Sequence, residues 1–329
     1  SLASIYIPEN ITSIQAAAFK GCTKLTNANC PLSLSLKNGA IANDAFDKCP
    51  VSVFRVEKDI TEQYLAINGM CGSKDDVVIP TEIGGMKVIA IADEAFGKAA
   101  NTPYFASIKA VTIPEGITSI GKKAFTKAAA LINVSIPSTV TIISESAFEQ
   151  CTSLTSAPLH DKIIEIGTNA FKGCSSMKTA TIYGSTTKIN DGAFQDCTSI
   201  SSISLPNSVT EVGEEAFRNC SSMTTLKLSE SLSEIKLGTF AQCTNLAAVD
   251  FPESITSIAD GTTTSGTKPT GDGAFSDCKS LTEVVFHKKF RSIGAVAFSD
   301  CFGIEKITLP EGLKNIGDLA FSGCIRLDN

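Results

Sequence analysis

Apolar residues recur along this chain in a fixed order that repeats every 23 residues over long stretches. Each unit contains a V-x-I segment, an I-x-x-I segment and an Ala-Phe pair, as in LINVSIPSTVTIISESAFEQCTS at residues 131–153. Alternation of apolar and polar residues over a few positions predicts a short strand with one buried face. The pattern therefore predicts two short extended segments per unit, followed by a brief helical turn that carries Ala and Phe inward.

The phenylalanine of the Ala-Phe pair marks the repeat. Five consecutive steps of 23 residues lead from Phe125 to Phe240, and two more follow Phe275. One unit of this size cannot bury its own apolar side, whereas stacked units bury a continuous core. We therefore expect a single repeat array over residues 1–329. Its 12 markers are Phe19, Phe46, Phe96, Phe125, Phe148, Phe171, Phe194, Phe217, Phe240, Phe275, Phe298 and Phe321.

Two places depart from the repeat. The step from Phe46 to Phe96 spans 50 residues and contains an irregular junction at residues 51–76. A later step of 35 residues contains ADGTTTSGTKPTGDG at residues 259–273, whose Gly, Thr and Pro content predicts a surface loop. Such an insertion is either neutral or the place where a partner is held, with Thr264 and Lys268 as its candidate residues.

Ten of the 12 cysteines lie three residues after a marker phenylalanine. Ala99 and Ala128 take the same place in two units, which indicates a position for a small buried side chain. Equivalent side chains in stacked units point the same way, so their Cβ atoms do not converge as a disulfide requires. The chain has no C-x2-C pair and only two histidines, His160 and His287, so we expect no metal site and no cofactor.

Charge and composition exclude some classes of function. The net charge is −6, and the lysines and arginines are scattered, which argues against nucleic-acid binding. No window approaches 18 uninterrupted apolar residues, so no membrane insertion is expected. The chain begins within a repeat and without a signal-peptide pattern, which predicts a fragment or a processed form. Neither histidine has an assignable nucleophile beside it, so we expect no catalytic triad and no enzyme.

The outward position of the first predicted strand is mostly small and polar. Small and β-branched polar residues suit a half-exposed strand, so this strip is either strand filler or a shallow binding face. Lys227 and Asp250 would be its charged centre, or a surface ion pair of little energetic value. The candidate partner-binding residues are therefore Thr181, Ser204, Lys227 and Asp250, with Thr264 and Lys268 of the insertion. The whole strip reads Thr112, Ser135, Pro158, Thr181, Ser204, Lys227, Asp250, Val285 and Thr308.

The motifs ITSIGKKAF, LPNSVTEVGEEAFRNCSSM and LPEGLKNIGDLAFSGCIRL resemble the BspA-like, treponemal-type leucine-rich repeat family, over nearly the whole chain. The resemblance implies an α/β repeat solenoid. This would be a curved, right-handed superhelix with short strands on one face and short helical or irregular segments on the other. It also implies a similarity to bacterial surface proteins that attach to host matrix proteins or to other cells.

From these observations we expect a non-enzymatic recognition protein, on the cell surface or secreted, that binds a protein partner such as a host matrix component. A glycan ligand is less favoured, because the chain has no Trp and four Tyr. Two alternatives stay open, a structural spacer without a ligand and an accessory binding region of a larger multidomain surface protein. Unpaired thiols also leave a cytosolic location open.

Overall fold

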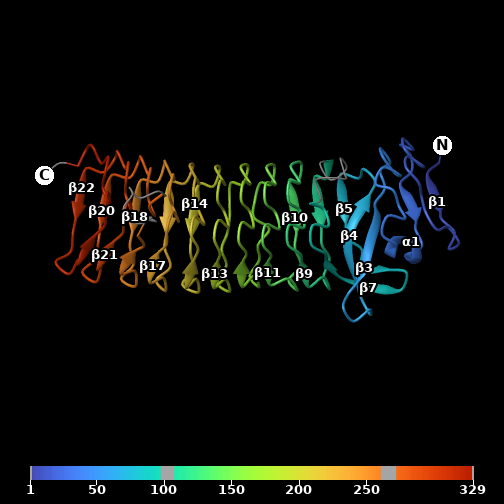
Figure 1. Cartoon of the computed structure of the whole chain (residues 1–329), viewed down its shortest axis with the longest axis horizontal. Coiled ribbons are helices and arrows are strands. Elements are labelled where there is room, and N and C mark those ends of the chain that lie inside the picture. The colour runs from blue at the N-terminus through green and yellow to red at the C-terminus, as the bar shows by residue number, and fades with distance from the viewer. Residues whose placement is uncertain (1, 98–106, 261–271, 328–329) are drawn as a thin grey trace. The chain divides into compact units, whose positions relative to one another are not determined.

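The computed structural model describes residues 2–97, 107–260 and 272–327. The chain forms two compact units, Ser1–Leu154 (unit 1) and Thr155–Asn329 (unit 2). In both units, short strands from successive repeats stack in parallel, so each unit is a β-solenoid (Figure 1).

Unit 2 follows the repeat closely. Its first strands pair in the order β14-β16-β18-β20-β22, and its second strands in the orders β12-β13-β15 and β17-β19-β21-β23. The two kinds of strand form an upper and a lower row in Figure 1. The first strands are β14 (Ser202–Ser204), β16 (Thr225–Lys227), β18 (Ala248–Asp250), β20 (Glu283–Val285) and β22 (Lys306–Thr308). The second strands are β12 (Glu165–Ile166), β13 (Lys188–Ile189), β15 (Glu211–Val212), β17 (Glu234–Ile235), β19 (Ser257–Ile258), β21 (Ser292–Ile293) and β23 (Asn315–Ile316).

Equivalent residues of neighbouring repeats pair with one another, so side chains of one kind form columns. Ile203 of β14 faces Leu226 of β16, and both are buried because the middle residue of each first strand points inward. The marker phenylalanines form a second buried column. Phe194, for example, stacks on Phe171 and Phe217 with ring centroids 5.3 and 5.4 Å apart. The sequence prediction of stacked strands around a phenylalanine column is thus confirmed.

The segment that carries Ala and Phe is not the helical turn expected from the sequence. It is a run of turns, and no α-helix occurs in the described residues of unit 2. Among the described residues, those two before and two after a marker have a positive φ, whether or not they are glycine, except Asp44 and Gly273. Around Phe194 these are Gly192 and Asp196, both with a φ of 60°. Even Val296 adopts a φ of 54°, although this conformation is unfavourable for a β-branched residue.

A second hydrogen-bond ladder explains these backbone conformations. When residues alternate between right-handed and left-handed backbone conformations, the N–H groups of every second residue point to the same side of the chain. In the Phe194 repeat, the N–H groups of Gly192, Phe194 and Asp196 all donate to carbonyl groups of the next repeat, at 2.8, 2.8 and 2.9 Å. The same pattern recurs around Phe217 and Phe298. A helix would have directed these N–H groups to its own carbonyls instead.

Unit 1 contains both regular repeats and the irregular junction. Its regular strands are β1 (Ser4–Tyr6), β2 (Asn27–Asn29), β5 (Asp76–Val78), β8 (Ala110–Thr112), β9 (Ser119–Ile120), β10 (Asn133–Ser135) and β11 (Ile142–Ile143). The junction contains β3 (Val53–Lys58) and β4 (Leu65–Cys71), and α1 (Leu32–Leu36), β6 (Glu82–Ile83) and β7 (Met86–Ile91) lie on either side of it along the chain. β3 and β4 form an antiparallel hairpin, and β4 pairs in parallel with β7.

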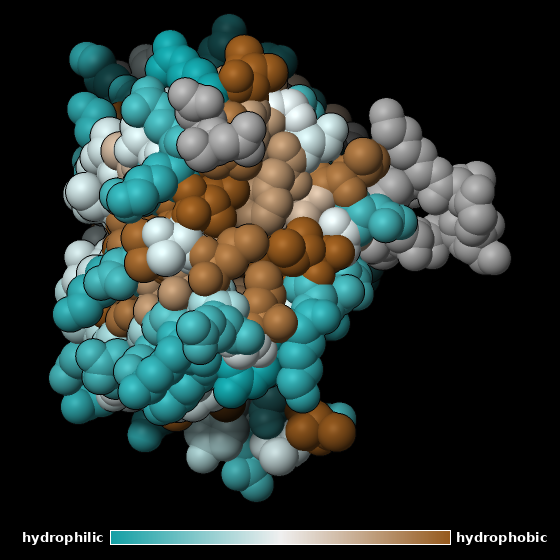
Figure 2. Space-filling model, turned by 90° about the vertical axis from the view of Figure 1, so that its left-hand side faces the viewer, coloured by the Kyte–Doolittle hydropathy of each residue, from teal (hydrophilic) through white to brown (hydrophobic). Residues whose placement is uncertain are grey.

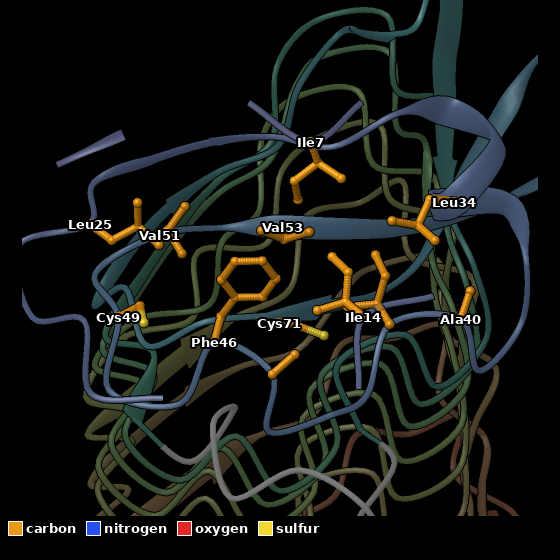
Figure 3. Close-up of a cluster of buried hydrophobic side chains, with 12 residues drawn as sticks. Ile7, Ile14, Leu25, Leu34, Ala40, Phe46, Cys49, Val51, Val53 and Cys71 are labelled. Carbon is orange, nitrogen blue, oxygen red and sulfur yellow. The ribbon is translucent and has the colours of Figure 1, made fainter. Parts of the chain in front are cut away.

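One apolar cluster joins the first repeats of unit 1 to the junction (Figure 3). Ile7, Ile14 and Phe46 come from the repeats, whereas Val53 and Cys71 come from the hairpin. All five are buried, so the hairpin completes the core that two repeats alone leave open.

The last repeat of unit 2 shows how the core is arranged in cross-section. Figure 2 views the molecule from that side, and apolar side chains gather at its centre with polar side chains around them. The large apolar residues exposed in this repeat are Leu309, Ile316, Leu319, Ile325 and Leu327.

Candidate functional site

Three of the predicted partner-binding residues lie side by side on the first-strand sheet of unit 2. Ser204 pairs with Lys227, and Lys227 pairs with Asp250, on β14, β16 and β18. All three are exposed, whereas the residue before each of them is buried. Val285 and Thr308 continue the same row on β20 and β22. We name these five residues, from Ser204 to Thr308, the strand strip.

A shallow depression of about 350 Å³ lies at the centre of the strand strip. Lys227 and Asp250 line it together with Glu230 and Pro252. Among the described residues, Lys227 and Asp250 form no ion pair with each other, although they face each other in register. The depression therefore presents one ammonium and two carboxylates to the solvent.

Glu230 is a site residue that the sequence reasoning missed. Its backbone N–H donates to Asn207 Oδ1 at 3.2 Å, and Asn207 Nδ2 donates to Glu230 Oε2 at 3.5 Å. These two bonds join equivalent positions of neighbouring repeats and hold Glu230 beside Lys227. Its place three residues after Lys227 is the only sequence signal for it.

Thr181 does not belong to the strand strip. It is exposed, but no strand forms at residues 179–181, where the only pairing is an isolated bridge between Ser156 and Thr179. In this register Pro158 would lie opposite Thr181, and proline has no N–H to donate to a ladder. The sheet prediction is therefore wrong for Thr181 and Pro158.

Thr264 and Lys268 lie outside the described residues, but both ends of the insertion are described. Asp260 Oδ1 accepts a hydrogen bond from the Ala295 N–H at 2.9 Å. Asp272 Oδ2 accepts one from Arg218 Nε at 2.6 Å and another from Gln242 Nε2 at 3.1 Å. Both ends of the insertion are thus held to the repeats of unit 2.

The second strands of unit 2 carry charges that pair across repeats. Glu211 binds Lys188 at 3.4 Å and Lys236 at 2.8 Å. The hydrogen bond from Lys236 lowers the pKa of Glu211, and the same bond raises the pKa of Lys236. These three charges pair with one another, in contrast to Lys227 and Asp250 of the strand strip.

The cysteine column is structural. All 12 cysteines lie in the described part of the chain, and none forms a disulfide. Eight of the ten column thiols donate to the marker phenylalanine carbonyl of the preceding repeat, as Cys197 does to Phe171 at 3.2 Å and Cys220 does to Phe194 at 3.4 Å. The sequence predicted a small buried side chain, and the structure adds this hydrogen bond. Ala128 fills its place without it.

Burial keeps these thiols protonated. It raises the pKa of Cys243 from its usual value of 9.0 to about 12, and raises the pKa of Cys197 and Cys220 in the same direction. Cys71, which lies off the column, has its pKa raised to about 11 for the same reason. Because the thiolate is the nucleophile and the metal ligand, these thiols are poor candidates for either role. Within the described residues, no group of three or more His, Cys, Asp or Glu side chains could hold a metal ion.

The two histidines are half-buried. His287 Nε2 bonds the Ile255 carbonyl at 2.8 Å, and its Nδ1 accepts the Lys289 N–H at 3.1 Å. His160 Nδ1 accepts the Lys162 N–H at 3.2 Å. Both rings stabilise the turn that follows them, because Nδ1 of each ring accepts a hydrogen bond from the backbone N–H two residues later.

A family model named BspA type Leucine rich repeat region matches residues 1–102, 90–190, 165–268 and 262–329, in six copies. The chain belongs to the BspA-type leucine-rich repeat family. The fold expected from the resemblance, a leucine-rich-repeat solenoid, is confirmed, with turns in place of helical segments. No helix among the described residues is long and apolar enough to span a membrane.

Solved structures of bacterial leucine-rich repeat proteins have the same fold. The pneumococcal vaccine antigen PcpA is 18% identical, with a TM-score of 0.57, and the match covers 84% of this chain and 78% of that one. A leucine-rich repeat protein from Bacteroides ovatus is 21% identical, with a TM-score of 0.56 over 84% of this chain and 92% of the other. One from Eubacterium ventriosum is 18% identical, with a TM-score of 0.51 over 98% and 82%. No curated protein sequence matches the chain.

Proposed function

We propose that this BspA-type repeat protein is a non-enzymatic recognition protein, displayed on a cell surface or secreted, that binds a protein partner through the strand strip. The observation that carries this proposal is the depression at Lys227 and Asp250. Its charged groups are exposed, and Lys227 and Asp250 form no ion pair with each other, whereas Lys188, Glu211 and Lys236 of the second-strand row pair with one another. Charges that are unpaired in the free protein are available to pair with a partner, and they set orientation and specificity.

The flanking positions also favour a protein ligand. Ser204 and Thr308 are small and polar, so another chain can approach the backbone of the sheet closely. Lys227 and Asp250 have opposite charges on adjacent strands, a pattern that suits a partner with both charges at matching spacing. The family relationship supports the same class of function, since repeat solenoids present extended surfaces for binding. A host matrix protein is the first candidate for the partner.

Binding to a panel of purified matrix proteins and glycans, measured by biolayer interferometry, tests this function. Lys227→Glu and Asp250→Lys should each weaken binding by about ten-fold or more. Glu234→Lys is the matched control, because Glu234 is exposed on β17, outside the strand strip. Variants that bind as tightly as the wild type would exclude the strand strip. A folded wild-type chain that binds nothing in the panel would favour the structural spacer.

A separate variant tests the insertion. Deletion of residues 261–270 removes Thr264 and Lys268 and retains Asp260 and Asp272, which hold the ends of the segment. Binding that is lost in the deletion but retained in Lys227→Glu would place the partner at the insertion.

A further inference from the structure

The β3–β4 hairpin is the largest departure from the repeat in unit 1. β3 and β4 pair from Val53 with Cys71 to Lys58 with Leu65, and residues 59–64 form the loop between them. In Figure 1 this loop, in blue, extends past the neighbouring turns of unit 1. The base of the hairpin is buried in the core described above, whereas Glu57 and Lys58, at the end of β3 next to the loop, are exposed.

The loop has a defined structure because Asp59 organises it. Asp59 Oδ1 accepts the Tyr64 N–H at 2.9 Å, and Asp59 Oδ2 accepts the Thr61 hydroxyl at 2.7 Å. The Asp59 backbone also bonds Tyr64 and Glu62, at 3.0 and 2.9 Å. With both carboxylate oxygens and both backbone groups engaged, the loop has few alternative conformations left.

This ordered loop carries Ile60 into the solvent. Ile60 is 101% exposed, more than any other large apolar residue in the described part of the chain. Scattered apolar residues on a surface are ordinary. Ile60 differs because it is completely exposed, lies on a loop fixed by hydrogen bonds, and belongs to a segment outside the repeat.

The charges around Ile60 indicate what it can bind. Glu57, Asp59 and Glu62 carry three carboxylates, and Lys58 carries one ammonium, which gives a net charge of −2 on the tip. Lys58 already pairs with Glu62, at 3.5 Å. An acidic tip is repelled by anionic lipid surfaces and attracted by basic groups.

We propose that the hairpin tip, residues 57–64, is a docking element for a partner protein, which receives the Ile60 side chain in an apolar pocket bordered by Lys or Arg. This site is in unit 1 and is independent of the strand strip in unit 2. An anchor on a preordered loop binds well because little conformational entropy remains to be lost on binding. Transfer of an exposed isoleucine into such a pocket accounts for about ten- to hundred-fold in affinity.

A phage-displayed library of random peptides, selected on the immobilised full chain, tests the proposal. Selected peptides are synthesised, and their affinities are measured for the wild type, Ile60→Ser and Val78→Ser. Val78 is the matched control, because it is a 59% exposed apolar residue on another strand of unit 1. We expect peptides with an apolar residue flanked by Lys or Arg that bind Ile60→Ser about ten-fold or more weakly and Val78→Ser as tightly as the wild type. The proposal is overturned if no selected peptide depends on Ile60.

Two further measurements separate the parts of the argument. Asp59→Ala keeps Ile60 but frees the loop. It should weaken peptide binding about three- to ten-fold and speed hydrogen exchange at the Tyr64 amide, and unchanged binding would contradict the role of preordering. Vesicles of phosphatidylcholine and phosphatidylserine should not bind the chain, and binding that requires Ile60 would overturn the protein partner in favour of a membrane.

Discussion

Truncation of one marker phenylalanine tests the packing of the repeat core. Phe194 is fully buried between Phe171 and Phe217, so Phe194→Ala removes a side chain that neighbouring repeats contact from both sides. Phe→Ala substitutions in cores cost about 3–5 kcal/mol, and each aromatic stack contributes about 0.5–1.5 kcal/mol of such a total. We therefore expect a loss near the upper end of this range, about 4–5 kcal/mol. Phe194→Leu restores most of the volume without the stacks and should cost about 1–3 kcal/mol.

Cys197→Ala is the matched control, because it lies in the same repeat and the same core. It removes one thiol and its hydrogen bond to the Phe171 carbonyl, and Ala128 already shows that alanine fits this position. It should therefore cost only about 1 kcal/mol. Urea denaturation followed by far-ultraviolet circular dichroism measures the free energy of unfolding for all three variants.

Hydrogen exchange locates the damage. The amides of Phe194 and Asp196 donate to the next repeat, so their exchange should accelerate most in Phe194→Ala. The phenylalanine column is not the main stabilising part of the core if Phe194→Ala and Cys197→Ala lower the free energy of unfolding equally, or if Phe194→Ala lowers it by less than about 1 kcal/mol.

Three more predictions concern the thiols, the turns and the insertion. The pKa of Cys243 is raised by burial to about 12, so the unfolded chain releases this proton above its usual pKa of 9.0 while the folded chain retains it. The contribution of this thiol to the free energy of unfolding is therefore constant below pH 9 and falls by about 1.4 kcal/mol per pH unit between pH 9 and 12. Cys243→Ala should reduce the slope of the free energy of unfolding against pH in this range by that amount. Lys123→Gly should raise the free energy of unfolding by about 0.5–1 kcal/mol in urea titrations, because the exposed Lys123 has a φ of 55°, and a loss would contradict the strain argument. Asp272→Ala should cost about 1–2 kcal/mol, because Arg218 and Asp272 are only 26% and 28% exposed and Arg218 would lose its partner, and an unchanged urea midpoint would contradict this.

Much of the fold could be predicted because the repeat presents the same information many times. The inward places of Phe194 and Cys197 follow from the spacing alone, and so do the outward places of Ser204 and Lys227. Hydrophobic periodicity specifies which side chains are buried, and it does so for strands and turns alike.

The turn conformation could not be predicted in the same way. Lys123, Glu215 and Val296 all have a positive φ, and none of these residue types favours it. Their conformation is set by the hydrogen bonds to the next repeat, which local propensity does not contain. Local sequence alone therefore indicates a helical turn for the segment that carries the Ala-Phe pair.

Structural features that do not recur from repeat to repeat were the hardest to predict from the sequence. The β3–β4 hairpin occurs once, so no second copy shows that residues 53–71 turn back on themselves. Glu230 joins the depression only because Asn207 of the preceding repeat holds it there. Thr181 lies outside the sheet because of Pro158, in the repeat before it. The positions of Glu230 and Thr181 depend on contacts between repeats, which a pattern read along one unit does not reveal.

The one-way ladder of the turns gives the repeat stack a direction. In the repeats of Phe194, Phe217 and Phe298, the N–H groups of the marker and of the residues two before and two after it all donate forward to the next repeat. A repeat inserted in reverse would bring donors against donors and carbonyls against carbonyls. Whole units can therefore be duplicated or removed in steps of 23 residues with every bond restored, whereas a step of any other length must be absorbed in a loop, as at residues 259–273. Recombination between repeats can thus change the length of an array, because every new junction between 23-residue units has the same interface.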